Sequence, residues 1–424
     1  MAGPVPLSLL PDNSSVDEDG MLSIGDVPVD LLAAQYGTPL FIYDEEHLRT
    51  RCRQAVEAFG EGVAYATKAF LCRAMARVAY EEGMHLDVAT GGELRVALAA
   101  GVPGDKLVMH GNNKSELELA MALDAGVWRI VVDSFDELKR IERRHADTGQ
   151  VAPVLLRVTP GIEAHTHEYI ATGQDDSKFG FTVSSGLAGQ AVDRAMASPA
   201  IELYGIHAHI GSQVFRLDSF RKAAQALAEF SNPLDLPELS VGGGLGVAYV
   251  TGEETLPILA WGEIVLEACR DAGVTARVTA EPGRSIVAAA AITLYRVGTV
   301  KELGGIRTYV AVDGGMSDNP RPVLYGSGYE TFLPRSTDAA RELEVRVVGK
   351  HCESGDILVR DASVPDDIAV GDLLATPVTG AYGHSMGSNY NKVLRPAVVF
   401  VRDGDARQVV RRETYDDLLV TDVG

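Results

Sequence analysis

The segment Val63-Ala-Tyr-Ala-Thr-Lys-Ala-Phe70 begins as a short apolar strand, reaches a single lysine and leads into a helix-forming run, Leu71–Glu82. In α/β enzymes, side chains that carry chemistry stand at the carboxyl ends of strands, which is where Lys68 falls. Burial on apolar ground there would lower the pKa of the Lys68 amine and free it as a nucleophile toward carbonyl groups. The alternative is an exposed surface lysine that opens a helix, because lysine usually prefers solvent.

The pattern that starts at Val63 repeats along the chain as short apolar strands alternating with amphipathic helical runs. This alternation indicates parallel strands joined by helical crossovers. Eight such units in roughly 220 residues match the size of a (β/α)8 TIM-type barrel, and a doubly wound sheet is the competing arrangement. The expected strands are 62–66, 84–88, 107–109, 129–132, 153–158, 203–209, 238–242 and 277–280, and the helical runs include 92–100, 115–125 and 134–144.

After Arg284 the chain changes to strand-like segments rich in Val, Tyr and Thr, with Gly and Pro between them. Short strands with such turns predict a C-terminal antiparallel β-domain. We expect an N-terminal segment over 1–36, the barrel over 37–288 and the β-domain over 289–424, and the long insert 160–181 has the length of a loop that is functional or disordered. The expected strands of the β-domain are 292–300, 308–312, 343–348, 356–359, 372–376, 396–401 and 408–411.

Composition excludes several classes of protein. With 46% hydrophobic and 23% charged residues the chain is an ordinary globular protein, and its formal net charge of −21 argues against a nucleic-acid or anionic-membrane partner. The most apolar stretch, 286–292, is too short to span a bilayer, and the N-terminus lacks the basic start of a secretory signal. The four cysteines form no Cys-x-x-Cys pair, so a reducing, cytoplasmic location fits best.

Chemically useful residues fall at or near the carboxyl ends of the expected strands, the face where barrels build their sites. Glycines strip side chains from a loop, so backbone N–H groups can approach an anion such as a phosphate. Ser212 and Arg284 could add a hydroxyl and a cation, and a plain turn is the alternative interpretation of the glycine run. The chemically useful residues at these strand ends are Lys68 after the first strand, His207 and His209 in the sixth, Gly242–Gly244 closing the seventh, and Glu281-Pro-Gly-Arg284 after the eighth.

His207 and His209 share one face of a strand, because strand side chains alternate with a period of two. A metal pair would need a third ligand, and none is indicated nearby, although His165 and His167 form a second His-x-His in the long insert. We therefore expect no metal and a packed core histidine at His207. At His209 we expect a ring that could lie flat on a planar cofactor.

A lysine, an anion-binding loop, a ring to stack and a carboxylate together suggest pyridoxal phosphate as the cofactor. Lys68 would form the Schiff base, and Glu281 would keep the pyridine nitrogen protonated, which makes the cofactor a strong electron sink. Such a sink stabilises the carbanion left when CO2 departs, so the set of residues favours a decarboxylase. The alternative role of Glu281 is a salt bridge to Arg284.

Short motifs then follow one another in a fixed order from about Gly37 to the C-terminus. They are Tyr65-Ala-Thr-Lys-Ala69, His209-Ile-Gly-Ser-Gln213, Gly242-Gly-Gly-Leu-Gly246, Glu281-Pro-Gly-Arg284, Asp313-Gly-Gly-Met316, Arg321-Pro-Val-Leu-Tyr325, Cys352-Glu-Ser-Gly-Asp356, Gly380-Ala-Tyr-Gly383 and Ser388-Asn-Tyr-Asn391. In this order they resemble the barrel-type pyridoxal-phosphate decarboxylases, most closely the diaminopimelate decarboxylases. The resemblance implies that the early strand near Met21 joins the C-terminal β-domain.

The resemblance also implies a role for each matched position. Lys68 corresponds to the lysine that forms the aldimine, and His209 to the ring that stacks on the cofactor. Cys352 is similar to the family's general acid, whereas the residue alone would suggest an inert buried thiol, the commonest state of a free cysteine. The positions that resemble cofactor contacts are Ser212, Gly243, Gly244, Glu281, Pro282, Gly283, Arg284 and Tyr382, and those that resemble substrate contacts are Arg284, Arg321, Tyr325, Glu353 and Tyr382.

In the family, the residues matched by Cys352 and Glu353 reach in from the partner subunit, so the resemblance implies a homodimer with shared active sites and a small amino-acid substrate. Diaminopimelate has a second amino-acid head, whose carboxylate and ammonium call for an arginine and a carboxylate, and Arg321 and Glu353 supply both. Without the resemblance, Arg321 and Tyr325 would be interpreted as a pair on a dimer-surface loop. The implied activity is pyridoxal-phosphate-dependent decarboxylation of meso-2,6-diaminopimelate to L-lysine and CO2.

Two alternative functions stay open. One is a decarboxylase of another free or carrier-bound amino acid, such as a lysine-like, ornithine-like or secondary-metabolite substrate, because Lys392-Val-Leu394 and His384 depart from the family pattern. The other is a non-catalytic pyridoxal-phosphate-binding paralogue. Such a protein could keep Lys68 and the anion-binding loop while losing Cys352, Glu353 or Arg321, and this chain has all three of the latter.

Overall fold

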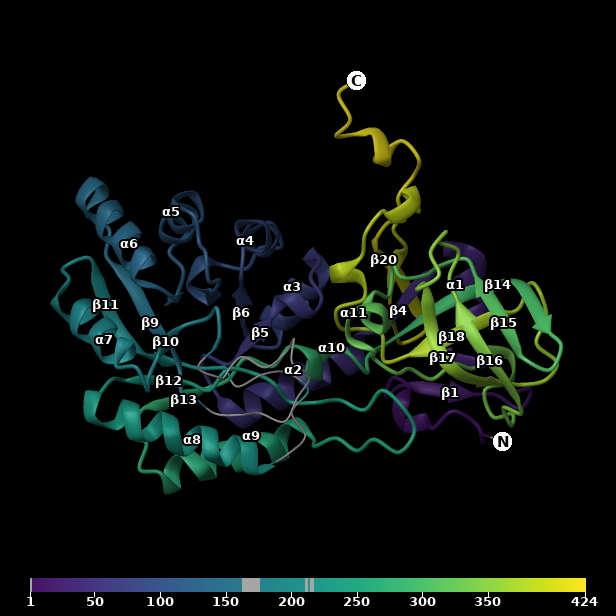
Figure 1. The fold of residues 1–424 in the computed structure, drawn as a ribbon, viewed down its shortest axis with the longest axis horizontal. Coiled ribbons are helices and arrows are strands. Elements are labelled where there is room, and N and C mark those ends of the chain that lie inside the picture. The colour runs from purple at the N-terminus through teal and green to yellow at the C-terminus, as the bar shows by residue number, and fades with distance from the viewer. Residues whose placement is uncertain (1, 162–175, 210–212, 214–216) are drawn as a thin grey trace. The chain divides into compact units, whose positions relative to one another are not determined.

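The computed structural model describes residues 2–161, 176–209, 213 and 217–424, and the chain divides into two compact units. The unit that we call the barrel contains residues 51–246 and 255–285. The unit that we call the β-domain contains the residues up to 50 together with 247–254 and 286–424. Figure 1 traces both units along the chain. Among the described residues, no helix is long and apolar enough to cross a membrane.

The barrel strands are parallel and lie in the order of the chain. The ring is closed by two hydrogen bonds, from Ala64 N–H to Ala280 O (3.0 Å) and from Ala66 N–H to Pro282 O (3.1 Å). The expected (β/α)8 barrel is therefore confirmed, since a doubly wound sheet would be open and would reverse its strand order. The strands are β5 (Ala64–Ala66), β6 (His85–Val88), β7 (Leu107–Met109), β8 (Arg129–Val132), β9 (Ala152–Thr159), β11 (Ile201–His207), β12 (Glu238–Ser240) and β13 (Arg277–Thr279), and β10 (Phe181–Thr182) pairs with β9.

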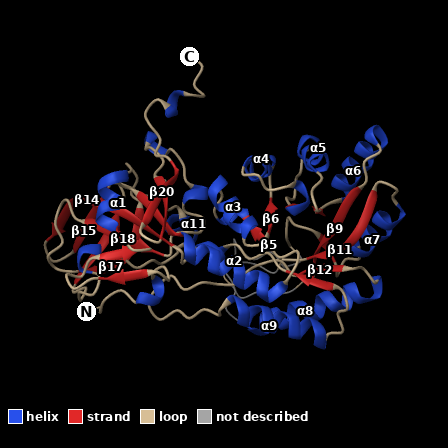
Figure 2. Cartoon of the chain, turned by 180° about the vertical axis from the view of Figure 1, so that it is seen from behind, coloured by secondary structure: helices blue, strands red, loops and turns tan. Residues whose placement is uncertain are grey.

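Polar side chains mark the starts of several barrel helices, which lie outside the strands in Figure 2. Thr90, Ser115 and Ser134 each accept a hydrogen bond from the backbone N–H three residues later. Gly126 and Gly149, with left-handed backbones, end two of the helices. The helices are α2 (Glu45–Phe59), α3 (Arg73–Glu81), α4 (Gly91–Ala99), α5 (Glu116–Ala125), α6 (Phe135–Thr148), α7 (Leu187–Ala197), α8 (Leu217–Ser231) and α9 (Ile258–Asp271).

The barrel interior is filled, because alternate residues of each strand point inward. At the amino ends of the strands, the Arg129 guanidinium donates to both carboxylate oxygens of Glu238 (2.9 and 2.5 Å) and lies 3.6 Å from the ring centroid of Tyr204. An apolar layer follows toward the carboxyl ends. This layer consists of Ala64, Val108, Val131 and Leu155. Beyond this apolar layer, polar side chains gather at the carboxyl ends of the barrel strands.

The main sheet of the β-domain has the order β17-β16-β15-β14-β4-β19-β20, and β18 pairs with β14. Most neighbours are antiparallel, as expected, but two pairs, β15–β16 and β4–β19, are parallel. The sequence did not reveal β4, whose five residues are all buried and lack an alternating pattern. The strands are β4 (Leu40–Asp44), β14 (Ala291–Leu303), β15 (Arg307–Val312), β16 (Leu343–Val348), β17 (Ile357–Val364), β18 (Leu373–Pro377), β19 (Ala397–Arg402) and β20 (Asp405–Val410).

The N-terminal segment forms a small sheet, β1 (Ser14–Val16), β2 (Leu22–Ile24) and β3 (Val27–Pro28), followed by α1 (Val29–Tyr36). Leu22 and Ile24 of β2 belong to the same buried apolar cluster as Leu294 and Val399 of the main sheet. The strand near Met21 thus packs on the β-domain, in agreement with the resemblance.

Asp318 is a buried carboxyl group in the β-domain, and its Oδ1 accepts a hydrogen bond from the Gly315 N–H (2.9 Å). Burial raises the pKa of Asp318 to about 7, and the charges of Asp313 and Asp356 add to the rise, while hydrogen bonds from Tyr295 and Gly315 oppose it. The ordinary value is 3.8, so between about pH 4 and pH 7 the folded protein holds a proton that the unfolded chain releases. Stability therefore falls as pH rises through this window.

We expect Asp318→Asn to remove the part of the fall in stability with rising pH that Asp318 causes. Between pH 5 and pH 8, the free energy of unfolding of the variant should rise by roughly 2 kcal/mol relative to that of the wild type, because the amide cannot ionise. Thermal unfolding at several pH values measures the gain. Asp361→Asn, at a side chain that is 87% exposed in the same unit, is the control. If stability changed with pH in the same way in Asp318→Asn and in the wild type, the raised pKa of Asp318 would be contradicted.

Candidate active site

The carboxyl ends of the barrel strands, which we call the barrel mouth, hold the loops singled out from the sequence. Lys68 lies in a short 3₁₀ turn after β5, and His209 follows β11 by two residues. Backbone groups tie these loops together, since each donates to the next around the ring. The bonds run from Ala66 N–H to Pro282 O (3.1 Å), from Glu281 N–H to Gly242 O (2.9 Å) and from Gly243 N–H to His209 Nδ1 (3.1 Å).

The glycine run after β12 needs glycine for its conformation and for its contacts. Gly242 and Gly244 have φ of 70° and 113°, in the region that glycine favours. A Cβ on Gly243 would stand 2.3 Å from the carbonyl oxygen of Glu281. The Gly243 N–H is engaged with His209, so this residue holds the histidine ring in place. The run is thus more than a plain turn.

Glu281 is 8% exposed and accepts two hydrogen bonds from buried side chains. His207 Nε2 lies 2.9 Å from Oε2, Ser240 Oγ donates to Oε1 (3.0 Å), and His110 Nε2 lies 3.3 Å from Oε1. Burial alone would raise the pKa of Glu281, but the positive charge on the pair formed by His207 and His110, and the hydrogen bonds of both rings, outweigh it and hold this pKa well below its usual value. Glu281 is therefore an anion, and its burial does not require the salt bridge to Arg284 that the sequence left open.

His209 is half-buried, and its Nδ1 accepts the hydrogen bond from Gly243. Burial lowers the pKa of His209 well below its usual value, and the positive charges of Lys68 and Arg157 lower it further. The ring is consequently neutral and carries its proton on Nε2. An uncharged ring with a fixed orientation can lie against the face of another ring.

Lys68 is exposed, so the expectation of a buried amine on apolar ground is wrong. The residue follows the end of β5 at the barrel mouth, where its neighbours are polar. Its charge opposes the burial that raises the pKa of Asp87, and it is the second cause, after burial, that lowers the pKa of His209. The amine is thus accessible and close to both groups.

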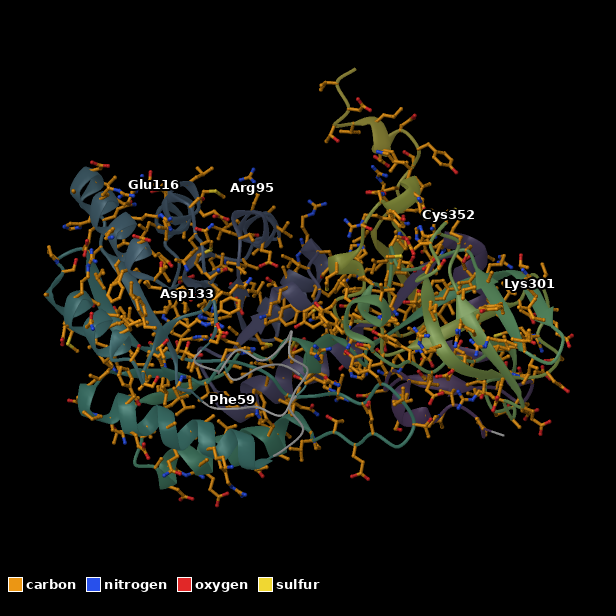
Figure 3. The ribbon with its side chains drawn as sticks, in the orientation of Figure 1. Phe59, Arg95, Glu116, Asp133, Lys301 and Cys352 are labelled. Atoms are coloured by element: carbon orange, nitrogen blue, oxygen red, sulfur yellow. The ribbon has the colours of Figure 1, made fainter. Side chains whose placement is uncertain are left out.

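Several polar residues at the barrel mouth were not expected from the sequence. Asp87 Oδ1 of β6 lies 3.7 Å from His110 Nε2, just after β7, and Asp133 after β8 pairs with Arg157 of β9 at 3.7 Å. Figure 3 labels Asp133. Each of these residues stands within two positions of the carboxyl end of an expected strand, as Lys68 and Glu281 do. That position was the signal that could have revealed them. Ser212, His165 and His167 lie outside the described residues.

Arg321 opens α11 (Arg321–Tyr325) in the β-domain and is only 5% exposed, so its interpretation as a surface residue is wrong. Its guanidinium donates to the Tyr329 hydroxyl and lies 4.1 Å from the ring centroid of Tyr249. Among the residues that the structure describes, none places a carboxylate within ion-pair distance of Arg321. The side chain is thus a buried cation held by aromatic rings. Tyr325 is half-buried.

Cys352 and Glu353 are exposed on the loop between β16 and β17, and Figure 3 labels Cys352. The interpretation of Cys352 as a buried thiol is therefore wrong, whereas the other three cysteines are buried. The loop is held at its backbone, because Cys352 N–H donates to Asn391 Oδ1 (3.1 Å). Asp356 accepts from the N–H groups of Met316 (2.7 Å) and His351 (2.9 Å). An accessible thiol thus stands on a fixed loop.

The remaining positions of interest lie in the C-terminal loops of the β-domain. Tyr382 is half-buried and has a positive φ of 63°. His384, which departs from the family pattern, packs edge-on against Phe41 with ring centroids 5.8 Å apart. Burial lowers the pKa of His384 to about 4, with a smaller contribution from Arg395, so the ring is neutral.

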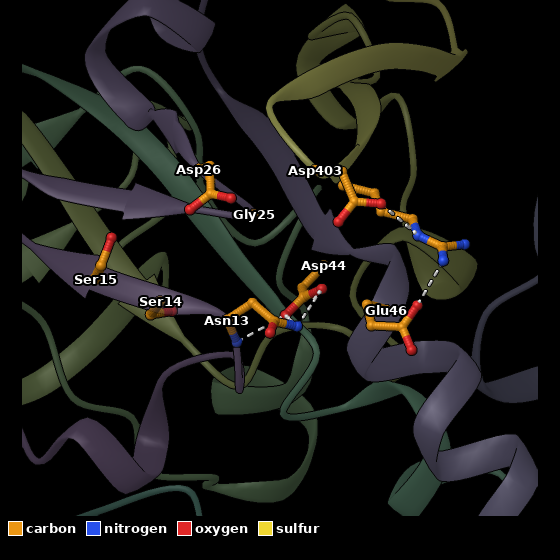
Figure 4. Close-up of a pocket in the computed structure, with 9 residues that line it drawn as sticks. Asn13, Ser14, Ser15, Gly25, Asp26, Asp44, Glu46 and Asp403 are labelled. Atoms are coloured by element: carbon orange, nitrogen blue, oxygen red, sulfur yellow. Dashed lines mark hydrogen bonds and ion pairs between the residues drawn. The ribbon is translucent and has the colours of Figure 1, made fainter.

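An acidic pocket of about 230 Å³ lies in the β-domain and contains none of the residues expected at the active site. Figure 4 shows that three of its acidic side chains, Asp44, Glu46 and Asp403, have partners within the lining. Asn13 Nδ2 donates to Asp44 (2.9 Å), and the Arg402 guanidinium pairs with Glu46 (3.0 Å) and Asp403 (3.2 Å). Most of the negative charge of this pocket is therefore already paired within the lining.

Comparison with known proteins gives a consistent result. The family model for the pyridoxal binding domain of pyridoxal-dependent decarboxylases matches residues 45–288. The diaminopimelate decarboxylase of Mycobacterium tuberculosis is 48% identical and that of Bacillus subtilis 45%, with 97% of both chains covered in each case. The chain belongs to the diaminopimelate decarboxylase family. The crystal structure of a family member from M. jannaschii in co-complex with L-lysine has a TM-score of 0.90 at 31% identity, covering 97% of this chain and 98% of that one.

The groups at the barrel mouth fit the pyridoxal phosphate that this decarboxylase family uses. The accessible Lys68 amine can reach an aldehyde, and the neutral His209 ring can lie on the cofactor ring. The buried anion of Glu281 suits a protonated pyridine nitrogen, since a negative charge favours the protonated form. The glycine run after β12 presents backbone without side chains, as the close approach of a phosphate requires. The resemblance inferred from the sequence is confirmed, whereas the role of each site residue stays a prediction.

Proposed function

We propose that this chain removes CO2 from the D-centre of meso-2,6-diaminopimelate and so produces L-lysine. The observation that carries the choice of substrate is the burial of Arg321 without a carboxylate partner among the described residues. A buried cation without a counter-ion is costly, and an anion that binds it relieves this cost. Diaminopimelate brings a carboxylate at its far end, whereas the far ends of lysine and ornithine carry only an ammonium group.

Bound pyridoxal phosphate supplies an electron sink for the carbanion that is left when CO2 departs. The chain's own residues position the reactants. Lys68 would bind the cofactor aldehyde, the His209 ring would lie against the cofactor, and anionic Glu281 would face the ring nitrogen. Further contacts to cofactor are assigned to Ser212, Gly243, Gly244, Pro282, Gly283, Arg284 and Tyr382.

The proton that replaces CO2 on the substrate carbon is assigned to Cys352 of the partner subunit, whose thiol becomes a thiolate as the new C–H bond forms. Glu353 of the partner subunit would hold the far ammonium group. Arg284, Arg321, Tyr325 and Tyr382 complete the substrate contacts. This assignment implies a homodimer with shared active sites, and the exposure of Cys352 in one chain supports it, because a thiol used by a second copy must be accessible. We infer a cytoplasmic location, because all four cysteines are free thiols, as a reducing compartment keeps them.

Release of CO2 from meso-diaminopimelate, L-lysine and L-ornithine, measured side by side on the holoenzyme, tests this function. We expect release from meso-diaminopimelate alone. Preference for lysine or ornithine would favour the decarboxylase of another amino acid. Activity on none of the three would favour a non-catalytic paralogue.

We expect Arg321→Gln to raise KM for meso-diaminopimelate by roughly 10–100-fold, because a charged hydrogen bond to the far carboxylate is lost. Steady-state kinetics of CO2 release measure the change. Arg360→Gln, at an exposed position of the same unit, is the matched control and should leave KM unchanged. An unchanged KM for Arg321→Gln would show that the buried guanidinium does not bind the substrate.

A further inference from the structure

Glu281 belongs to a buried cluster whose other members have no role in the proposed mechanism. His207 and Ser240 contact its two oxygens, and His110 stands between Glu281 (3.3 Å) and Asp87 (3.7 Å). The exposed fractions of these residues do not exceed 8%. Four of these groups are ionisable, namely Asp87, His110, His207 and Glu281. Because they are shielded from solvent, the protonation state of each depends on the charges of the others.

Geometry indicates which imidazole carries the positive charge. His110 Nε2 faces two carboxylates, whereas His207 Nε2 faces one. The two ring centroids are 5.0 Å apart, so two charged rings would repel each other. His207 Nδ1 has no hydrogen-bond partner in the part of the chain that the structure describes, as suits a neutral ring with its proton on Nε2.

The electrostatic surroundings agree with this assignment. Burial lowers the pKa of both rings, but around His110 the charges of Asp87 and Glu281 outweigh burial and raise the pKa. The pKa of His207 stays lowered, because burial is joined by the charges of His110 and Arg157. The groups that face this cluster are Asp87 on β6, His110 after β7, Arg157 on β9, His207 on β11, Ser240 on β12 and Glu281 after β13, and Lys68 and Glu93 act on Asp87.

We propose that His110 and Asp87 are positioning residues that form a buried imidazolium–carboxylate pair and thereby keep Glu281 ionised beside the ring nitrogen of the cofactor. This inference rests on the proposed binding of pyridoxal phosphate and is independent of the substrate. With His110 charged, the three residues carry a single net negative charge. Without it, two carboxylates share a buried site, and one of them must take up a proton. Glu281 would then lose its hold on the protonated ring nitrogen.

The wild-type protein tests the charge directly. In apoprotein with ¹⁵N-labelled histidine, NMR of the side chains should show both ring nitrogens of His110 protonated at pH 7, and only one of His207. The His110 signals are assigned by their loss in His110→Gln. A neutral His110 at pH 7 would overturn the proposal whatever the enzyme decarboxylates.

Charge-balanced variants test the consequence for the cofactor. His110→Gln keeps an N–H donor and removes the charge, so the visible absorbance of the bound cofactor should titrate about one pH unit or more away from the wild type. The affinity for pyridoxal phosphate should fall about tenfold, as expected for such a shift. Asp87→Asn/His110→Gln restores the single net negative charge. This double variant should reverse most of the shift in the titration and recover most of the lost affinity.

Three results would contradict this proposal. A double variant no better than His110→Gln would make the role of His110 steric, and an unchanged titration in His110→Gln would remove it from the cofactor's environment. One equivalent of a divalent ion in the purified wild type, lost in His110→Gln, would make His110, His207 and Glu281 metal ligands, since their ligand atoms lie within 4.8 Å of one another. Circular dichroism of each apoprotein confirms folding, and the wild-type NMR result holds even if a variant fails to fold.

Discussion

A Lys68→Ala protein is expected to lose the visible absorbance of the bound cofactor and roughly 10³-fold or more of its turnover. The reason is that the Lys68 amine is the group that we propose to bond covalently to the cofactor aldehyde. It is accessible at the end of β5, with Asp87 and His209 close enough to feel its charge. Absorbance spectra of the purified protein and rates of CO2 release measure the two effects.

Two variants separate covalent bonding from charge. Lys68→Arg keeps a positive charge near Asp87 and His209, but a guanidinium does not condense readily with an aldehyde, so this variant should behave like Lys68→Ala. Lys301→Ala, at an exposed position of β14 labelled in Figure 3, should leave spectrum and rate unchanged. A yellow Lys68→Ala protein with intact absorbance would contradict the assignment.

A Cys352→Ala protein is expected to keep the colour of the cofactor and lose roughly 10²–10⁴-fold of its turnover, the range for removal of a general acid. Cofactor binding should be unaffected, because Cys352 is exposed and is assigned only the proton transfer to carbon. Spectra and CO2 release on the same preparation measure both. Full turnover would remove Cys352 from the mechanism.

Mixed dimers test whether the thiol comes from the partner subunit. In a random mixture of Lys68→Ala and Cys352→Ala chains, half of the dimers are mixed, and each has one site with both residues intact. About a quarter of the wild-type activity should therefore return. Activity that stays at the level of the separate variants would place Lys68 and Cys352 of each site in the same chain.

Much of the fold was predictable from sequence because the barrel is made of local units. The expected strands 107–109, 129–132 and 343–348 coincide with β7, β8 and β16, since sharp turns bound each apolar run. The strand β4 could not be recognised, because its partners β14 and β19 lie hundreds of residues later in the chain. Strand β17 runs beyond the expected 356–359, because backbone pairing with β16 continues past the exposed Arg360 and Asp361.

Residues of the candidate site could be predicted where a motif contains a residue type that is unusual at the end of a strand. They could not be predicted where the function depends on several common residues that the fold brings together. The motifs placed Lys68, His209 and Glu281 at the ends of strands, and the structure joins their loops by backbone hydrogen bonds. The burial expected for Lys68 was wrong, because strand periodicity does not tell an apolar mouth from a polar one. His110 directly follows the expected strand 107–109, but this position alone did not show its importance, which comes from two carboxylates on other strands.

The position of β4 has a consequence for synthesis of the protein. Ribosomes make residues 40–44 early, but both neighbours of this strand in the sheet, β14 and β19, emerge only after the barrel strands have been made. During this interval an all-buried apolar segment has no partner, whereas the barrel strands that follow pair with neighbours close in sequence. The nascent chain is therefore vulnerable to aggregation at β4, and chaperone binding there would protect it until β14 and β19 arrive.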